Sequence, residues 1–392
     1  MVSSIGSKDR QWAAPLAAVL GCLQPAIDPV FLALASSATG LRAQDHGWVV
    51  GATQAAAALG AVLVWWLGLD RRAGAGRFAA SLALMAALLT PLADGLVWLL
   101  CLRAAYGLGM GAIYASAMGA YAARLEQHAA KAYGVVMLAQ LLLASAISPV
   151  LPIVADDLGA DGALWCLVLV PALALLAAEG VAPCSAALRH EAVRQPTPIA
   201  GWALALGTFW FICATMMVWS LSGGLAMAAG LGHDLIGRAV SLGSLAGAAT
   251  AWVVMRRSGR REVVPLALQG LLAGMAVLSP MWLIRPDGGA GFVGSMVLLN
   301  IGSTAMIILC SGLASAAGRD SRFRVLVAAT HNLGMTAGPA LGSALVWADP
   351  QSGVLTGAAL AIGLAVLAVG MAGWQQRPPA IRPYVIWRIG AR

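Results

Sequence analysis

The amino-acid sequence predicts an all-α polytopic membrane protein with twelve transmembrane helices divided equally between two halves. Three observations predict this fold class: an apolar composition, long apolar runs that recur along the chain, and a one-sided distribution of Lys and Arg. Hydrophobic residues make up 60% of the 392 positions and charged residues only 10%. A soluble domain with so few polar residues could not cover its own core, whereas a helix of about 20 apolar residues spans the hydrocarbon of a bilayer.

The apolar segments are predicted as spans by their length and hydropathy. They cover residues 12–34, 47–69, 78–93, 96–121, 133–154, 161–180, 201–224, 236–255, 263–284, 291–316, 325–347 and 352–374. The first ten residues are polar and the first apolar run continues into a full span, so we expect no cleavable signal peptide. The longest break contains Pro183, Pro196 and Pro198 and has the composition of a linker. The expected organisation is a six-helix bundle at 1–181, a cytoplasmic linker at 182–200, a second six-helix bundle at 201–374 and a cytoplasmic tail at 375–392.

The positions of Lys and Arg predict the orientation in the membrane. If the N-terminus lies in the cytoplasm, 20 of the 24 Lys and Arg residues fall in segments on the cytoplasmic side. Only Arg42, Arg238 and Arg285 fall on the opposite side, and Arg103 lies within a span. Since cytoplasmic loops are enriched in Lys and Arg, both termini are predicted to be cytoplasmic. The net charge of +8 follows from this bias and from attraction to anionic lipid, and indicates no nucleic-acid partner.

Two short motifs and an internal repeat identify a family resemblance. "GLRAQDHGWVVGA…WWLGLDRRAGAGR" in the first half is echoed by "GLGHDLIGRAVSLGS…WVVMRRSGRREV" in the second, as in repeat-built transporters. The loop after the second span contains Asp70, Arg71, Gly74 and Arg77. It partly resembles the Gly-x-x-x-Asp-Arg-x-Gly-Arg signature of the major facilitator superfamily, with Trp66 at the first glycine position and the second glycine displaced by one residue. "RAAYGLGMG", which begins at Arg103, fits that superfamily's Arg-x-x-x-Gly-x-Gly-x-Gly pattern at every fixed position.

The resemblance implies a fold, a substrate cavity and a latch. In the major facilitator fold two six-helix bundles are related by a pseudo-twofold axis, and helices 1, 4, 7 and 10 line a central cavity. Asp70, Arg71 and Arg77 would form a conformational latch, and the resemblance implies helix 11, near Arg324, as its partner. A carboxylate at the membrane face can cap a neighbouring helix N-terminus or pair with arginines. Ordinary positive-inside charges explain Arg77 well and Asp70 poorly.

Two ionisable residues lie deep within predicted spans, where burial costs roughly 2.5–3.5 kcal/mol or more. Asp28 lies about 24 Å along helix 1 and Arg103 about 10 Å into helix 4 from the other end, so both occupy the outer half of the membrane. We therefore expect them to meet directly or through substrate, with Arg103 directed into a cavity rather than toward lipid. The alternative is that Asp28 is solvated near a kink made by Pro25 and Pro29.

Further residues are predicted to bind substrate because they share a face with these charges or lie on the cavity-lining helices of the superfamily. Gln24 lies one turn before Asp28 on the same face. The other predicted substrate-binding residues are Tyr106, Met110, Trp210, Phe211, Thr215, Asn300, Thr304, His331 and Asn332. For the aromatic residues and the methionine, packing in the core or against lipid is the alternative, and His331 has a structural or a protonation role. Gly107, Gly109 and Gly111 are predicted to allow close helix packing.

The sequence contains no P-loop, no nucleotide-binding domain and no paired metal ligands, so we expect no cofactor, no metal and no enzymatic activity. An electrochemical gradient is then the expected driving force, and a carboxylate beside an arginine favours protons. Asp28 followed by proline resembles drug:proton antiporters and favours efflux. Import of a small organic or aromatic acid by proton symport is the alternative, since the aromatic-acid:proton symporters share the acid in helix 1 and the arginine-glycine motif in helix 4. A sensor without transport activity or a membrane-embedded enzyme is the alternative from another class.

The expected setting is a monomer in a bacterial inner membrane, where its partners are lipid, protons and a small organic solute.

Overall fold

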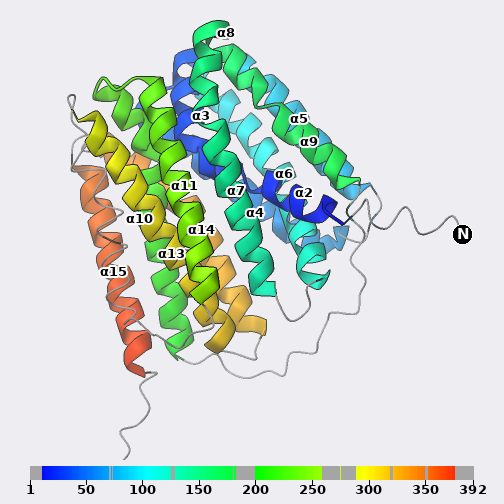
Figure 1. Cartoon of the computed structure of the whole chain (residues 1–392), viewed down its shortest axis with the longest axis vertical. Helices are drawn as coiled ribbons and strands as arrows, with labels where there is room; N and C mark the ends of the chain where they lie inside the picture. The colour runs from blue at the N-terminus through cyan, green and yellow to red at the C-terminus, as the bar shows by residue number, and fades with distance from the viewer. Residues whose placement is uncertain are drawn as a thin grey trace, which may run out of the picture.

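The computed structural model describes residues 11–69, 72, 74–124, 129–179, 181, 199–257, 274, 288–317, 321–348 and 352–375. In these ranges the regular secondary structure is helical throughout, and the helices run side by side as two groups (Figure 1). Helices α2 to α9 belong to the part of the chain before residue 181, and helices α10 to α15 to the part after residue 198. We refer to these parts as the N-terminal half and the C-terminal half.

The first predicted span is a broken helix. It consists of α2, Ala13–Gly21, and α3, Gln24–Thr39, with a bend of 42° between them. Pro25 explains the break, because proline lacks the N–H that an uninterrupted helix requires and its ring clashes with the preceding turn. A 3₁₀ turn, η1 at Ala43–Asp45, then leads into α4, His46–Leu67, which ends at Gly68 in the left-handed conformation with φ of 61°.

Five further α-helices follow in the described residues of the N-terminal half. They are α5 at Ala75–Leu89, followed by a 3₁₀ turn η3 at Thr90–Leu92, α6 at Leu96–Arg124, α7 at Ala129–Ile147, α8 at Val150–Cys166 and α9 at Leu169–Ala178. Within α8 the chain turns at Gly159, whose φ of 79° and ψ of 165° are not helical. Since a side chain would be strained at that φ, glycine permits the reversal. The fifth span therefore ends, and the sixth begins, within α8.

The C-terminal half contains longer, uninterrupted helices. They are α10 at Ile199–Ala228, α11 at His233–Arg257, α13 at Gly289–Ala317, α14 at Ser321–Ala348 and α15 at Gly353–Gln375. In this half α10 packs against α14 and α15, and α11 packs against α13. Gly338 on α14 lies against the backbone of Cys213 on α10, an approach that a side chain at position 338 would block.

Helices of the structure coincide with every predicted span except 263–284, which apart from Gly274 lies outside the described residues. Among the described residues, eight helices are long and apolar enough to cross a membrane, or nine if the bent pair α2 and α3 forms one span. Three spans predicted as single helices are interrupted: 12–34 after Gly21, 133–154 at Pro149, and 161–180 at residues 167–168. The predicted linker and tail fall almost entirely on residues that the structure does not describe.

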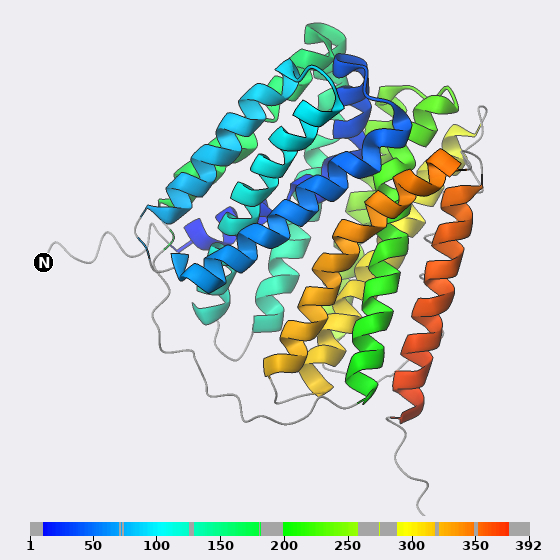
Figure 2. The ribbon, with the colours of Figure 1, turned by 180° about the vertical axis from the view of Figure 1, so that it is seen from behind.

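The two halves contact each other closely at one end of the molecule. This closed end, as we call it, holds the Thr39–His46 connection. There Gly47 of α4 lies against the carbonyl of Pro339 on α14. The hydroxyl of Ser37 on α3 forms a hydrogen bond with Nε2 of His233 on α11 at 2.9 Å. Away from this end α4 and α14, blue and orange in Figure 2, diverge, and Gly60 of α4 packs instead against Leu108 of its own half. The helices α7 and α11 stay in contact from Ser148 and Gly237 to Gly134 and Met255.

Candidate functional site

Asp28 is buried within the N-terminal half, on α3. Only 2% of its surface is exposed. The amide Nε2 of Gln24 donates a hydrogen bond to Asp28 Oδ1 at 2.8 Å, which the one-turn spacing of the two residues makes possible. The second oxygen, Oδ2, is buried and has no hydrogen-bond partner among the described residues. One oxygen of the carboxyl group is therefore held in place, and the other is left without a protein donor.

Arg103 lies on α6 with its guanidinium between two aromatic rings. Its central carbon, Cζ, is 4.4 Å from the ring centroid of Phe31 and 4.4 Å from that of Tyr106. The residue is 3% exposed, and its Nε has no hydrogen-bond partner among the described residues. Aromatic faces stabilise a desolvated cation through their quadrupoles. The two rings therefore help to hold an arginine that cannot readily lose its proton.

The two charged groups are neighbours without a direct ion pair. Ion pairs within 4.0 Å in the described part of the chain join Arg42 to Asp45, Arg77 to Glu179 and Arg238 to Asp234. Asp28 and Arg103 are nevertheless near enough to interact electrostatically. A second group or a small movement is therefore needed to join them directly.

A small cavity adjoins the guanidinium. Its volume is about 10 Å³, close to the lower limit for one water molecule. It is lined by Gln24, Phe31, Ala87, Thr90, Arg103, Tyr106, Leu164 and Leu167. All of these residues belong to the N-terminal half, on α3, α5, α6 and α8 and in the turns that follow α5 and α8. In this conformation the cavity has no room for an organic solute.

The glycines that follow Arg103 hold α6 against two different helices. A Cβ at Gly107 or Gly111 would collide with the backbone of Thr53 or Ala57 on α4. A Cβ at Gly109 would collide with the backbone of Ala79 on α5. The motif therefore packs α6 between α4 and α5, which fixes the direction in which Arg103 leaves the helix.

The predicted residues of the C-terminal half lie apart from this cavity. The Thr215 hydroxyl donates to Phe211 O at 3.0 Å within α10, where Trp210 is half-buried. The Asn300 amide donates to Met296 O at 2.9 Å within α13, and Thr304 lies one turn further, against α11. On α14 His331 is half-buried and Asn332 exposed. In the N-terminal half, Met110 is buried beside Gly21 of α2.

The predicted latch is only partly described. Asp70 and Arg71 lie outside the described residues, as does the side chain of Arg324. Arg77, at the start of α5, forms an ion pair with Glu179 at 3.1 Å, and both side chains are more than half exposed. In this conformation Arg77 therefore forms its ion pair with a residue of the same, N-terminal half.

Phe31 and Thr90 also surround Arg103 and were not predicted from the sequence. Phe31 lies seven residues after Gln24, so helical periodicity places both on the face of Asp28 and could have identified it. Thr90 lies in η3, and its hydroxyl donates to Ala86 O at 2.8 Å. Nothing in its sequence context indicates that it borders the cavity. Among the described residues no group of His, Cys, Asp and Glu could hold a metal ion.

The comparisons with known proteins identify the fold. No protein-family model matches the sequence, and no curated protein matches it. A solved structure does match: a bacterial homologue of the human lysosomal transporter Spinster, in an inward-facing and occupied conformation. The TM-score is 0.67 with 16% sequence identity, over 95% of this chain and 96% of that one. The fold class predicted from the sequence is thereby confirmed, and the chain has the fold of a major facilitator transporter.

Proposed function

We propose that this protein is a secondary active transporter that moves a small organic solute across a membrane by alternating access, coupled to protons. The observation that carries the proposal is the buried pair of Asp28 and Arg103 in a major facilitator fold. An acid and a base deep in the apolar interior are costly, and such groups mark proton or substrate pathways. Neither the fold alone nor the apolar composition would specify coupling to protons.

The contacts of Asp28 support proton exchange at one oxygen. Gln24 fixes Oδ1, whereas Oδ2 has no donor among the residues that the structure describes. An added proton at Oδ2 would neutralise the carboxyl group and weaken its attraction to Arg103. Since Arg103 keeps its charge, its guanidinium would then be available to water, to solute or to a second acceptor. Protonation would in this way change the electrostatic interaction between α3, which carries Asp28, and α6, which carries Arg103.

For the direction of transport we propose efflux by proton antiport. The basis of this proposal is the position of Asp28 in the outer half of the first predicted span. Proton symport of an aromatic acid is the second candidate, supported by the guanidinium of Arg103 between Phe31 and Tyr106. That arrangement would suit a carboxylate with a ring, because guanidinium pairs with carboxylates in bidentate geometry. The proposed setting is a bacterial inner membrane with both termini in the cytoplasm.

Proton flux in proteoliposomes tests the proposal. The purified protein is reconstituted with a pH-sensitive dye inside the vesicles, and candidate solutes are added outside, lipophilic cations in one series and aromatic acids in another. Antiport predicts that solute entry drives protons out, and symport predicts that solute and protons enter together. Solute movement without proton movement would contradict coupling. No solute-dependent flux in either series would instead favour a sensor or an enzyme.

A further inference from the structure

Proline in a helix leaves the carbonyl four residues earlier without its usual donor, because proline has no N–H. Pro29 lies inside α3, so the carbonyl of Pro25 lacks its α-helical partner. Pro149 ends the helical run of α7, so the carbonyl of Ser145 lacks its partner in the same way. A buried carbonyl without a donor is destabilising, so each of these two oxygens requires another hydrogen bond.

Both oxygens receive that hydrogen bond from the opposite half of the protein. The indole Nε1 of Trp219, on α10, donates to the carbonyl of Pro25 at 2.6 Å. The hydroxyl of Ser241, on α11, donates to the carbonyl of Ser145 at 2.7 Å. The N-terminal half thus supplies two carbonyls freed by proline, and the C-terminal half supplies two side-chain donors.

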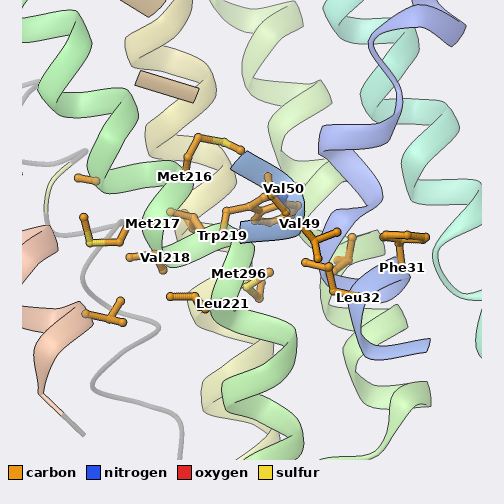
Figure 3. Packing of buried hydrophobic residues seen from close by; sticks show 14 of the residues in the cluster. Phe31, Leu32, Val49, Val50, Met216, Met217, Val218, Trp219, Leu221 and Met296 are labelled. Carbon is orange, nitrogen blue, oxygen red and sulfur yellow. The ribbon is translucent and has the colours of Figure 1, made fainter. Parts of the chain in front are cut away.

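The surroundings of Trp219 show that this contact is built into the packing. Trp219 is 7% exposed and lies among the buried apolar side chains of α3, α4 and α10 (Figure 3). One turn further along α10, Gly223 lies directly against the carbonyl of Pro29, where a side chain would collide. The pair Trp219 and Gly223 therefore matches the pair Pro25 and Pro29, each with a spacing of four residues. A buried indole N–H generally has a partner, and here the partner is the carbonyl freed by proline.

We propose that Pro29 with Trp219, and Pro149 with Ser241, form two inter-half latches that hold the closed end together. Each latch exists only while the halves are in contact, and separation of the halves breaks both hydrogen bonds. The inference rests on the alternating access of the proposed function, but it requires neither proton coupling nor a particular solute. Water that enters on opening replaces both hydrogen bonds in part, so the latches bias the equilibrium without blocking it.

The test measures how often the closed end opens. Ser343 on α14 is fully buried against Gly47 of α4, and its hydroxyl has no hydrogen-bond partner among the described residues. Ser343→Cys therefore introduces a thiol that becomes reactive when α4 and α14 separate. Its labelling rate with a polar maleimide is measured on detergent-solubilised protein, after subtraction of the rate of the parent chain with its six native cysteines.

Removal of either donor is expected to raise the labelling rate. Trp219→Phe keeps an aromatic ring, although a smaller one, and removes the indole N–H, and Ser241→Ala removes one hydroxyl with little change in volume. We expect each to increase labelling about fivefold, the population shift that the loss of one ordinary hydrogen bond produces. The matched controls are Trp202→Phe, at an exposed position of the same helix, and Ser295→Ala, whose hydroxyl bonds within its own helix to Gly291. Both controls are expected to leave the rate unchanged.

Proline replacement separates the latch from ordinary packing. Pro29→Ala restores an N–H that can satisfy the Pro25 carbonyl within α3, so opening no longer leaves this oxygen without a donor. We expect Pro29→Ala to raise labelling, and Trp219→Phe to add nothing in that background. The pair Pro149→Ala and Ser241→Ala is expected to behave in the same way. Equal effects of the donor variants with and without proline would overturn the proposal, as would unchanged labelling in both donor variants. Labelling does not report transport, so a failed flux experiment leaves this test intact.

Discussion

At Asp28 the two carboxylate oxygens have different surroundings, and this difference decides what the residue can do. Gln24 donates to Oδ1, and Oδ2 has no hydrogen-bond partner among the described residues. A structural carboxylate in an apolar interior is normally paired on both sides. The absence of a donor to Oδ2 in the described part of the chain therefore supports the proposal that Asp28 gains and loses a proton.

The first prediction concerns the charge of Asp28. Asp28→Asn keeps the shape and an oxygen acceptor for Gln24 but cannot change its charge. We expect it to reduce uphill solute accumulation driven by a pH gradient at least tenfold, while exchange of solute at equal concentrations is retained. Both are measured in proteoliposomes. Asp94→Asn, at an exposed position in the loop before α6, is the control. Unchanged accumulation by Asp28→Asn would remove Asp28 from the coupling step.

The second prediction distinguishes two roles of Arg103. If Arg103 mainly serves as the electrostatic partner of Asp28, Arg103→Ala shifts the pH dependence of transport for every solute. If it binds a carboxylate of the solute, the loss is selective for anions, and Arg103→Lys restores only part of it because the planar guanidinium is gone. Transport rates over a range of pH, for one cationic and one anionic solute, separate these outcomes. Normal transport of both by Arg103→Ala would exclude both roles.

At the scale of helices, the length of the apolar runs predicted most of the architecture. The positions of α4, α6, α10 and α11 follow from uninterrupted apolar runs, since a run of that length has no other stable conformation in lipid. The breaks at Gly21 and Pro149 are less predictable, because proline can kink a helix, begin one or remain within it. Pro29 and Pro339 lie inside continuous helices, whereas Pro25 begins one. Tertiary contacts, such as the indole of Trp219 on Pro25, decide between these cases.

The arrangement around Arg103 shows a second limit of prediction from sequence. The glycine motif on α6 identified Arg103 and the glycines that follow it. The spacing of Gln24 and Asp28 placed these two residues on one face of α3. The motif did not indicate that Gly107 and Gly109 face different helices. Contacts between helices depend on tilt and rotation, which a single apolar segment does not specify. The rings that surround the guanidinium were therefore only half predicted, with Tyr106 and without Phe31.

The third prediction tests the packing of α6. At Gly107 an added Cβ would collide with the carbonyl of Thr53, a backbone atom that cannot move without α4. Gly107→Ala is expected to destabilise the protein by about 1–3 kcal/mol through overpacking. Gly119→Ala is the matched control, since nothing lies within 4 Å of a Cβ there and the same helix gains from alanine. Thermal unfolding in detergent measures both. Equal unfolding temperatures for the two variants would contradict the packing interpretation.

For the whole molecule, sequence symmetry predicted two halves but not which end would be closed. The same chain must adopt both closed-end and open-end conformations if it transports by alternating access, so a pattern of residues cannot specify only one of them. The contacts that select this conformation are small and distant in sequence: Gly47 with Pro339, Ser37 with His233, and Trp219 with Pro25. None of these contacts has a local sequence signature.

The last prediction uses two glycines that face the same helix with different clearance. A Cβ at Gly47 would overlap the carbonyl of Pro339, whereas a Cβ at Gly51 would lie 3.4 Å from Thr336 O, an ordinary contact. Gly47→Ala is therefore expected to push α4 and α14 apart at the closed end, and Gly51→Ala to leave their contact intact. Because overpacking costs about 1–3 kcal/mol, the open population should rise about tenfold.

Hydrogen exchange followed by mass spectrometry measures this open population in peptides that cover residues 37–47 and 336–345. Faster exchange confined to those peptides in Gly47→Ala would indicate separation of the halves, whereas faster exchange throughout α4 and α6 would indicate that the N-terminal half itself is destabilised. Equal exchange in the two variants would show that this glycine contact does not control the closed end.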